Sequence, residues 1–204
     1  MKIYETLNWL NDWKKLPAYK AEPRVDFIVA GTLPEIIKNK YNCNITVIIP
    51  ELPIRIGSIY EDLDIDKSYK VDFYLYLENG KHLFIEFKTD SGSRRVKQDK
   101  YLLASQSVGM KAILDGIIKI NSVTNYKTKY SHLIKKLLTA GLILESNSNY
   151  QPNIVQYEIE ILYIQPKAIS SNEIGFDEIA KLMNESDDLF YKKFSEILFS
   201  WSND

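Results

Sequence analysis

The clearest pattern in the chain is a pair of apolar segments rich in β-branched and aromatic residues. Residues 69–77 read YKVDFYLYL, residues 82–89 read HLFIEFKT, and the segment 78–81 between them reads ENGK. Two such segments on either side of an Asn-Gly sequence predict two antiparallel strands joined by a tight turn. We therefore expect a β-sheet at the centre of the fold.

Periodic apolar positions predict helices before and after this hairpin. We expect helices at residues 2–15, 23–41, 94–108, 110–120 and 128–141, the last ending at a Gly141 cap, and one or two more at 176–201. Further strands are expected at 45–49, closed by Pro50, and at 154–164, with an acidic loop at 62–66. Because no repeat, low-complexity tract or Gly/Ser-rich linker divides the chain, we expect a single α/β domain over residues 1–204. Its core would span about 24–165, followed by a helical addition at about 170–204.

The length of the central turn decides which side chains share a face of the sheet. A two-residue turn would pair Asp72 with Phe87, whereas a three-residue turn at 78–80 pairs Asp72 directly with Glu86. The three-residue register also gathers six apolar side chains on one face, which the hydrophobic effect favours. These are Phe73, Leu75, Leu77, Leu83, Ile85 and Phe87. Glu86 and Lys88 are two positions apart on one strand and project to the same side.

Composition and charge narrow the class of protein. Hydrophobic residues make up 45% of the 204 and charged residues 26%, which is typical of a folded globular chain. The single cysteine, Cys43, excludes an internal disulfide, and neither a signal-peptide stretch nor a membrane span is evident, so we expect a cytoplasmic protein with no membrane partner. The net charge is −1, but residues 81–136 hold twelve Lys and Arg against four Asp and Glu. This basic segment is either a pair of solvated helix faces or a surface for a polyanion.

The paired carboxylates suggest a metal site. Asp72 and Glu86 on neighbouring strands would supply the hard oxygen ligands that Mg²⁺ prefers, and Mg²⁺ usually takes only one or two protein carboxylates plus substrate phosphate oxygens. Lys88 would position or deprotonate an attacking water, or neutralise the phosphate, and the sequence leaves these roles open. The alternative is a solvated cross-strand ladder in which Lys88 forms a salt bridge to Asp72 or Glu86.

Val71-Asp72 on one strand and Ile85-Glu86-Phe87-Lys88 on the next, followed by a helix, resemble the PD-(D/E)XK nuclease superfamily over residues 24–108. The resemblance implies a restriction-endonuclease-like core, in which helices flank a central mixed β-sheet in the order α-β-β-β-α-β, here with extra C-terminal helices. It also implies Asp72 and Glu86 as metal ligands and Lys88 as the catalytic lysine. Valine stands at position 71 in place of the proline of the family name.

The same resemblance suggests further site residues. Many members place a glutamate on the first core helix, for which the candidates are Glu35 and Glu22, and a glutamine on the helix after the lysine, here Gln98. Gln98 and Tyr101 resemble the helix motif of RecB-type nucleases with a spacing of three instead of four, and both spacings return to one helix face. The residues around Gln98 are candidates for nucleic-acid contacts or form a solvated helix face. They are Arg94, Arg95, Lys97, Lys100 and Tyr101.

Taken with the resemblance, these residues predict a nuclease that hydrolyses phosphodiester bonds in DNA with Mg²⁺ or Mn²⁺. Cutting both strands of a duplex often takes two copies of a single site, so a homodimer is one possible assembly. Two alternatives stay open. The chain is either a catalytically silent module of the same fold that binds nucleic acid or a protein partner, or an enzyme that cleaves RNA.

Overall fold

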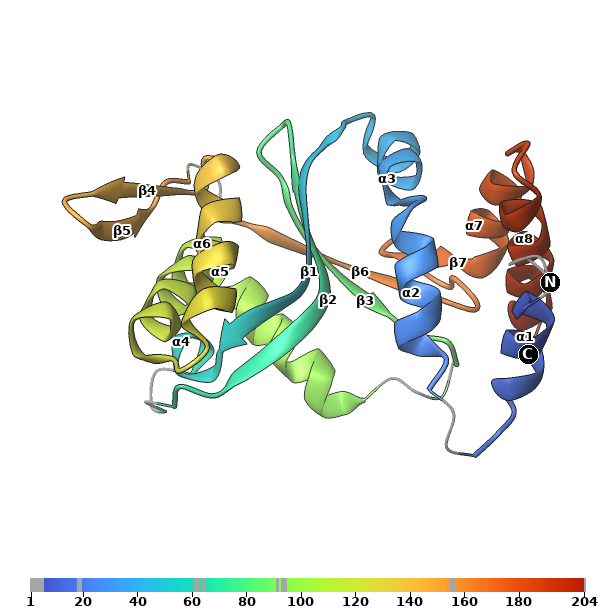
Figure 1. The fold of residues 1–204 in the computed structure, drawn as a ribbon, viewed down its shortest axis with the longest axis horizontal. Helices are drawn as coiled ribbons and strands as arrows, with labels where there is room; N and C mark the ends of the chain where they lie inside the picture. The colour runs from blue at the N-terminus through green and yellow to red at the C-terminus, as the bar shows by residue number, and fades with distance from the viewer. Residues whose placement is uncertain are drawn as a thin grey trace. The chain divides into compact units, whose positions relative to one another are not determined.

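The computed structural model of the chain describes residues 6–17, 20–60, 63, 65–90, 92, 95–154 and 157–203 (Figure 1). The described helices are α1 Leu7–Trp13, α2 Glu22–Ala30, α3 Leu33–Tyr41, α4 Ile56–Ile59, α5 Val96–Val123, α6 Lys127–Thr139, α7 Phe176–Asn184 and α8 Leu189–Trp201. The described strands are β1 Ile45–Arg55, β2 Ser68–Leu77, β3 His82–Phe87, β4 Ile143–Ser146, β5 Asn149–Pro152, β6 Ile159–Gln165 and β7 Glu173–Gly175.

Five of these strands form the central sheet, in the order β1-β2-β3-β6-β7. The pairs β1/β2 and β2/β3 are antiparallel and β6/β7 is parallel, so the sheet is mixed. The expected α/β class with a mixed central sheet flanked by helices is confirmed. The finer expectation of a restriction-endonuclease-like core stays a prediction.

The chain divides into two compact units, each made of segments that are distant in sequence. The first unit holds Met1–Asn44, Glu86–Arg94 and Leu162–Asp204, and the second holds Ile45–Ile85 and Arg95–Ile161. They are called unit 1 and unit 2 below and are described separately. The expectation of a single domain over residues 1–204 stays a prediction.

In unit 2, the core forms where α5 packs against β1, α4 and α6. Its apolar positions alternate on the strands and recur at helical spacing on α5, so they share one buried face. They include Leu52, Ile54, Val71, Phe73, Met110, Ile113, Leu114 and Ile117. Gly109 interrupts α5 with φ 77° and ψ 169°, a conformation open mainly to glycine. The predicted break between residues 108 and 110 is confirmed at this kink, where the Met110 amide donates to the Tyr157 carbonyl at 2.7 Å.

Strand β1 corrects one prediction. The strand was expected to end before Pro50, but it runs through Pro50 and Pro53 to Arg55. Because β1 is an edge strand in the sheet order, a proline that lacks an N–H need not break the ladder there. Edge position is set by tertiary structure and not by local sequence, which explains the error.

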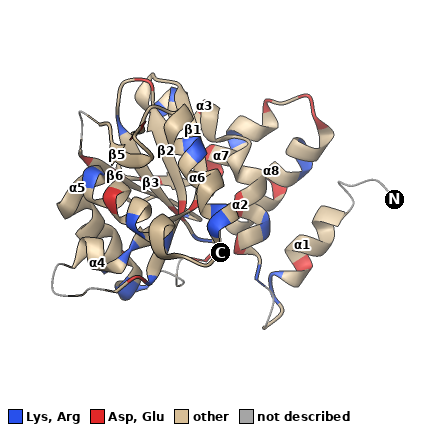
Figure 2. Cartoon of the chain, turned by 60° about the vertical axis from the view of Figure 1, so that its left-hand side comes forward, with Lys and Arg blue, Asp and Glu red and all other residues tan. Residues whose placement is uncertain are grey.

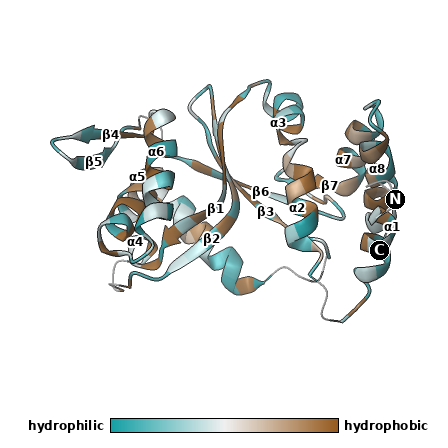
Figure 3. Cartoon of the chain, viewed as in Figure 1, coloured by the Kyte–Doolittle hydropathy of each residue, from teal (hydrophilic) through white to brown (hydrophobic). Residues whose placement is uncertain are grey.

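A two-stranded sheet of β4 and β5 follows α6 and was not predicted. Gly141, with φ 71°, follows the end of α6 and closes it, since its amide donates to the Leu138 carbonyl and the next amide to the Leu137 carbonyl. Asn147 and Ser148 at the hairpin turn also have positive φ. Apart from Ile143 and Leu144 at the start of β4, the hairpin is hydrophilic (Figure 3). It therefore lacks the apolar alternation by which strands are found.

In unit 1, aromatic side chains join α7, α8 and the end of β3. The rings of Phe87 and Phe176 stack at 5.7 Å between centroids, and Phe176 lies 6.4 Å from Trp201. Trp201 Nε1 donates a 2.7 Å hydrogen bond to Asn11 on α1, and α1 packs against α8. The strand β7, only three residues long, was not predicted.

The helix expected over residues 23–41 is in fact two helices, α2 and α3. The break lies at Gly31 and Thr32, where the Thr32 hydroxyl donates to the Val29 carbonyl at 2.8 Å. Pro34 then stands in the first turn of α3, where a proline is tolerated but would break a continuous helix.

Candidate active site

The C-terminal end of β3 brings a buried lysine and a buried glutamate together in unit 1. Lys88 Nζ lies 2.6 Å from Glu86 Oε1, and the two side chains are 5% and 1% exposed. The ammonium also donates to the Phe87 carbonyl at 2.8 Å. The strand alternation that sends Phe87 into the aromatic core thus holds Glu86 and Lys88 on the opposite side.

Hydrogen bonding from β6 fixes the backbone at this point. The Lys88 amide donates to the Ile164 carbonyl at 2.8 Å. Every described residue of β3 is buried, so the charged pair lies at the end of a strand from which water is excluded. Among the residues that the structure describes, no buried side-chain nitrogen or oxygen lacks a hydrogen-bond partner. The cost of burying two charges is therefore offset locally by pairing.

A second carboxylate approaches the same ammonium from α2. Glu22 is the first residue of that helix, and its Oε2 lies 3.7 Å from Lys88 Nζ. The Glu22 side chain is 38% exposed, so this carboxylate, unlike the Lys88 ammonium, is in contact with solvent. A carboxylate in the first turn of a helix is stabilised by the helix dipole. Unit 1 therefore holds one ammonium against two carboxylates.

Of the two expected first-helix glutamates, Glu22 contacts Lys88, while Glu35 lies elsewhere in the unit. Glu35 is exposed on α3 and lines a cavity of about 510 Å³ together with residues of α7 and α8. Thr32, Met183 and Tyr191 belong to the same lining.

The β2/β3 turn has the predicted length. Leu77 and Lys81 close it through the Leu77 amide and the Lys81 carbonyl, with Gly80 at φ 85°. The register runs from Tyr76↔His82 to Phe73↔Ile85, as a three-residue turn requires. The prediction of this turn is confirmed. Asp72 is half-buried on β2 in unit 2, and its pairing with Glu86, one step beyond these pairs, stays a prediction.

The first turns of α5 in unit 2 hold the other expected residues. Gln98 is half-buried, and Arg95, Lys97 and Lys100 are exposed, as an interaction surface or a solvated face would require. The Tyr101 ring stacks on Tyr69 at 5.2 Å and meets Tyr60 edge-on at 6.0 Å, with Lys97 Nζ 5.8 Å above it. Arg94 lies outside the described residues, as do Asp62 and Asp64 of the expected acidic loop. Lys and Arg are interspersed with Asp and Glu over the ribbon (Figure 2).

The chemistry of the carboxylates suits Mg²⁺, but their arrangement is only partly that of a metal site. Within the described ranges, no group of three or more His, Cys, Asp or Glu side chains is placed to hold a metal ion. Glu86 and Glu22 present oxygen donors, and Mg²⁺ needs few protein ligands. In this structure the Lys88 ammonium lies 2.6 Å from Glu86 Oε1 and 3.7 Å from Glu22 Oε2, so a metal ion would compete with it for Glu86.

Comparisons with known proteins give no relative whose function could help to interpret this geometry. No protein-family model matches the chain, and neither a curated protein nor a solved structure does. The search for membrane spans found no described helix with the length and apolar character needed to cross a bilayer.

Proposed function

We propose that this chain is a metal-dependent nuclease that hydrolyses phosphodiester bonds in DNA. Asp72 and Glu86 would bind Mg²⁺ or Mn²⁺, with Glu22 as the acid from the first core helix. The bound ion would polarise the scissile phosphate and activate a water molecule. Lys88 would orient that water or stabilise the charge that develops on the phosphate.

The observation that supports this proposal most is the burial of Lys88 beside Glu86. A buried ion pair contributes little net stability compared with apolar side chains of similar volume. Its presence at the end of a buried strand is therefore better explained by chemistry than by folding. The register of β2 and β3 adds support, since the turn has the length that the proposed pairing of Asp72 with Glu86 needs.

Cleavage assays test the proposal directly. Linear, circular, single-stranded and branched DNA, and RNA of the same sequence, are incubated with Mg²⁺ or Mn²⁺. We expect wild-type protein to cut DNA, and we expect Glu86→Gln, Asp72→Asn and Lys88→Met to lose about a hundredfold or more of the rate. Lys81→Met is the matched control, because Lys81 forms its ion pair with Glu160 in unit 2. Preference for RNA would redirect the proposal to the RNA-cleaving alternative.

Metal binding separates loss of chemistry from loss of folding. Because Lys88 competes for Glu86, Lys88→Met should bind Mn²⁺ at least as tightly as wild type while cleavage is lost. Glu86→Gln should weaken Mn²⁺ binding. Circular dichroism of each variant identifies any that fail to fold, and such a variant is replaced by Lys88→Arg or Glu86→Asp.

The second candidate is a catalytically silent module that binds nucleic acid or a protein partner. It is favoured by the Lys88 ammonium, which already pairs with Glu86 at 2.6 Å and lies 3.7 Å from Glu22. Such a module would be indifferent to Mn²⁺, and none of the substrates would be cut. Sedimentation analysis with and without duplex DNA would test the homodimer that cutting both strands suggests.

A further inference from the structure

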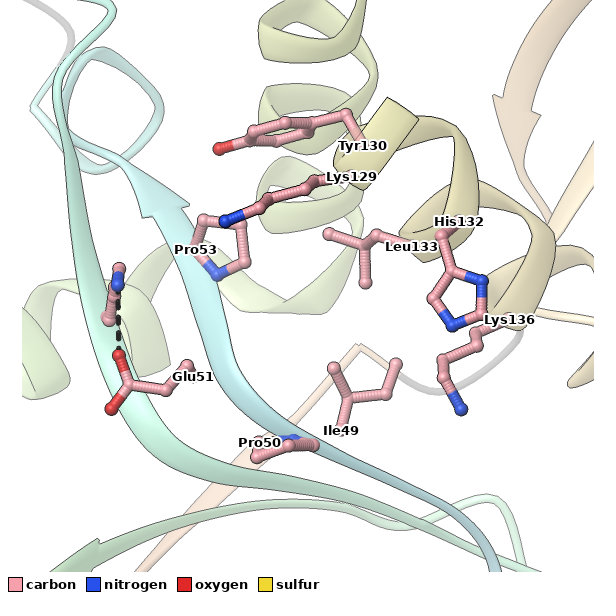
Figure 4. A pocket seen from close by; sticks show the side chains of 10 residues that line it. Ile49, Pro50, Glu51, Pro53, Lys129, Tyr130, His132, Leu133 and Lys136 are labelled. Atoms are coloured by element: carbon pink, nitrogen blue, oxygen red, sulfur yellow. Dashed lines mark ion pairs between the residues drawn. The ribbon is translucent and has the colours of Figure 1, made fainter. Parts of the chain in front are cut away.

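Unit 2 contains a pocket between β1 and α6, in a part of the molecule that the proposed nuclease chemistry does not use. Its volume is about 360 Å³, within the range of small-molecule sites. The lining consists of Ile49, Pro50, Glu51, Pro53, Lys70, Lys129, Tyr130, His132, Leu133 and Lys136 (Figure 4). Both walls belong to the same unit.

The floor of the pocket is apolar. Ile49 of β1 and Leu133 of α6 point toward one another across it, with Pro50 and Pro53 along the strand (Figure 4). The two prolines have no N–H, so this stretch of edge strand offers fewer donors to a pairing strand. A strand is therefore a poor occupant, and an apolar body can lie against the floor.

The rim of the pocket is cationic. Lys129, His132 and Lys136 recur at spacings of three and four on α6, so they face the same side of the helix. Helix α6 contains no Asp or Glu, and within the described part of the chain neither Lys129 nor Lys136 forms a salt bridge. On the opposite side, Lys70 Nζ is paired with Glu51 Oε2 at 3.1 Å. Three lysines thus face one carboxylate.

Tyr130 adds a neutral polar group. Burial raises the pKa of the Tyr130 hydroxyl above its ordinary value, although a hydrogen bond with Ser68 and the charge of Lys70 act to lower it. The hydroxyl is therefore protonated at neutral pH and brings no negative charge to the pocket. An anion entering the pocket meets no repulsion from this side chain.

We propose that this pocket binds a small amphipathic organic anion. Its apolar body would lie on Ile49, Pro53 and Leu133. Its carboxylate, phosphate or sulfonate would be held by the ammonium groups of Lys129 and Lys136. An inorganic anion would leave the apolar floor unused, and a cation would be repelled by the rim. The proposal is independent of the nuclease assignment.

Titration calorimetry with a matched ligand set tests this assignment. The probes are 1-naphthoate, naphthyl phosphate, 1-naphthylmethanol, 1-naphthylmethylammonium and inorganic phosphate. The naphthoate and the naphthyl phosphate should bind, and the other three should bind about tenfold more weakly or not at all. Equal binding of the alcohol or the ammonium ion would overturn the proposal, as would no binding of either anion up to about 1 mM.

Variants then locate the site. Lys129→Ala with Lys136→Ala should weaken naphthoate binding about tenfold or more, and Leu133→Asp should abolish it. Lys135→Ala is the control, since Lys135 lies on the same helix outside the pocket lining and its loss should change affinity less than about twofold. Unchanged affinity in the double variant overturns the proposal. Binding of single-stranded DNA alone, with no small anion bound, would also overturn it and indicate a nucleic-acid surface instead.

Discussion

In unit 1 the Lys88 ammonium is withdrawn from solvent between Glu86 and Glu22, whereas in unit 2 Lys129 and Lys136 border an open pocket without an ion pair among the described residues. Both regions contain lysine beside apolar side chains. They differ in the surroundings of the lysine ammonium. A buried carboxylate pairs with it in unit 1, whereas Lys129 and Lys136 in unit 2 are exposed to solvent.

This difference has energetic consequences. A buried charge costs several kcal/mol to desolvate, so it is tolerable only while its partner is present. An exposed lysine keeps its hydration and needs no partner. The stability of unit 1 should therefore depend steeply on its charged residues, whereas the lysines around the pocket should be nearly neutral for folding and available to a ligand.

The largest expected effect follows from removing the charge of Lys88. Lys88→Met keeps the length and apolar stem of the side chain but leaves the buried Glu86 carboxylate without its ammonium. We expect the free energy of unfolding to fall by about 3–5 kcal/mol, the usual cost of breaking a buried pair. Urea denaturation followed by circular dichroism measures the change.

Lys81→Met provides the control for Lys88→Met. Lys81 Nζ and Glu160 Oε2 are 2.8 Å apart, close to the distance in the buried pair, but these side chains are 38% and 35% exposed. We expect the control to cost less than about 1 kcal/mol because water screens the pair. Equal losses in the two variants would show that burial is not the decisive variable.

A pair with one buried partner should fall between these limits. The Arg55 side chain is 3% exposed, the Asp66 side chain is 51% exposed, and Nε and Oδ1 are 2.7 Å apart. Asp66→Ala should lower the free energy of unfolding by about 1–3 kcal/mol, because a charged buried donor loses a hydrogen bond. Asp66→Asn keeps an acceptor and should cost less in the same urea titration. A larger loss for Asn than for Ala would contradict this account.

The features of the fold and the site that depend on local periodicity could be predicted from the sequence. The positions of Glu86 and Lys88 on one side of β3 follow from alternation, and the three-residue turn follows from the demand that Phe73, Leu75 and Ile85 share an apolar face. The break between the helices expected at 94–108 and 110–120 also follows from local periodicity, and it falls at Gly109, where α5 is kinked. Each of these features is decided by neighbours in sequence.

Other features depend on contacts between distant segments. The sequence could not choose between Glu22 and Glu35, since the choice depends on which helix end approaches Lys88. Pro50 was misinterpreted as the end of a strand because the edge position of β1 is a property of the whole sheet. The pocket was missed because Ile49 and Leu133 are brought together only by folding, although the recurrence of lysine and histidine on α6 was a visible signal.

A buried tyrosine and histidine in unit 2 test whether the cost of a lost contact depends on burial or on the unit that holds it. Tyr74 is fully buried, and its hydroxyl shares a 2.8 Å hydrogen bond with His82 Nδ1. Tyr74→Phe should therefore cost about 1 kcal/mol at neutral pH. Burial, together with nearby Tyr76, raises the pKa of Tyr74 well above its ordinary value.

The raised pKa of Tyr74 also predicts alkaline sensitivity. Tyrosine in the unfolded chain ionises near pH ~10, while Tyr74 in the folded chain keeps its proton to a higher pH. The folded state then binds more protons, so the free energy of unfolding falls as pH rises above about 10. Tyr74→Phe should have a shallower slope in urea titrations between about pH 9 and 11. Identical slopes would exclude Tyr74 as the cause.

The smallest effect is expected at the pocket itself. Removing Lys129 and Lys136 together should change the free energy of unfolding by less than about 0.5 kcal/mol, because substitutions of solvated side chains without special contacts are nearly neutral. Added salt should reduce even this change, since it screens repulsion among the pocket lysines. Urea titrations of the double variant and wild type at low and high salt measure both quantities. A loss as large as that in Asp66→Ala would mean that the two lysines support the fold. Stability close to wild type would instead leave their charge free for ligand recognition, as the proposed anion site requires.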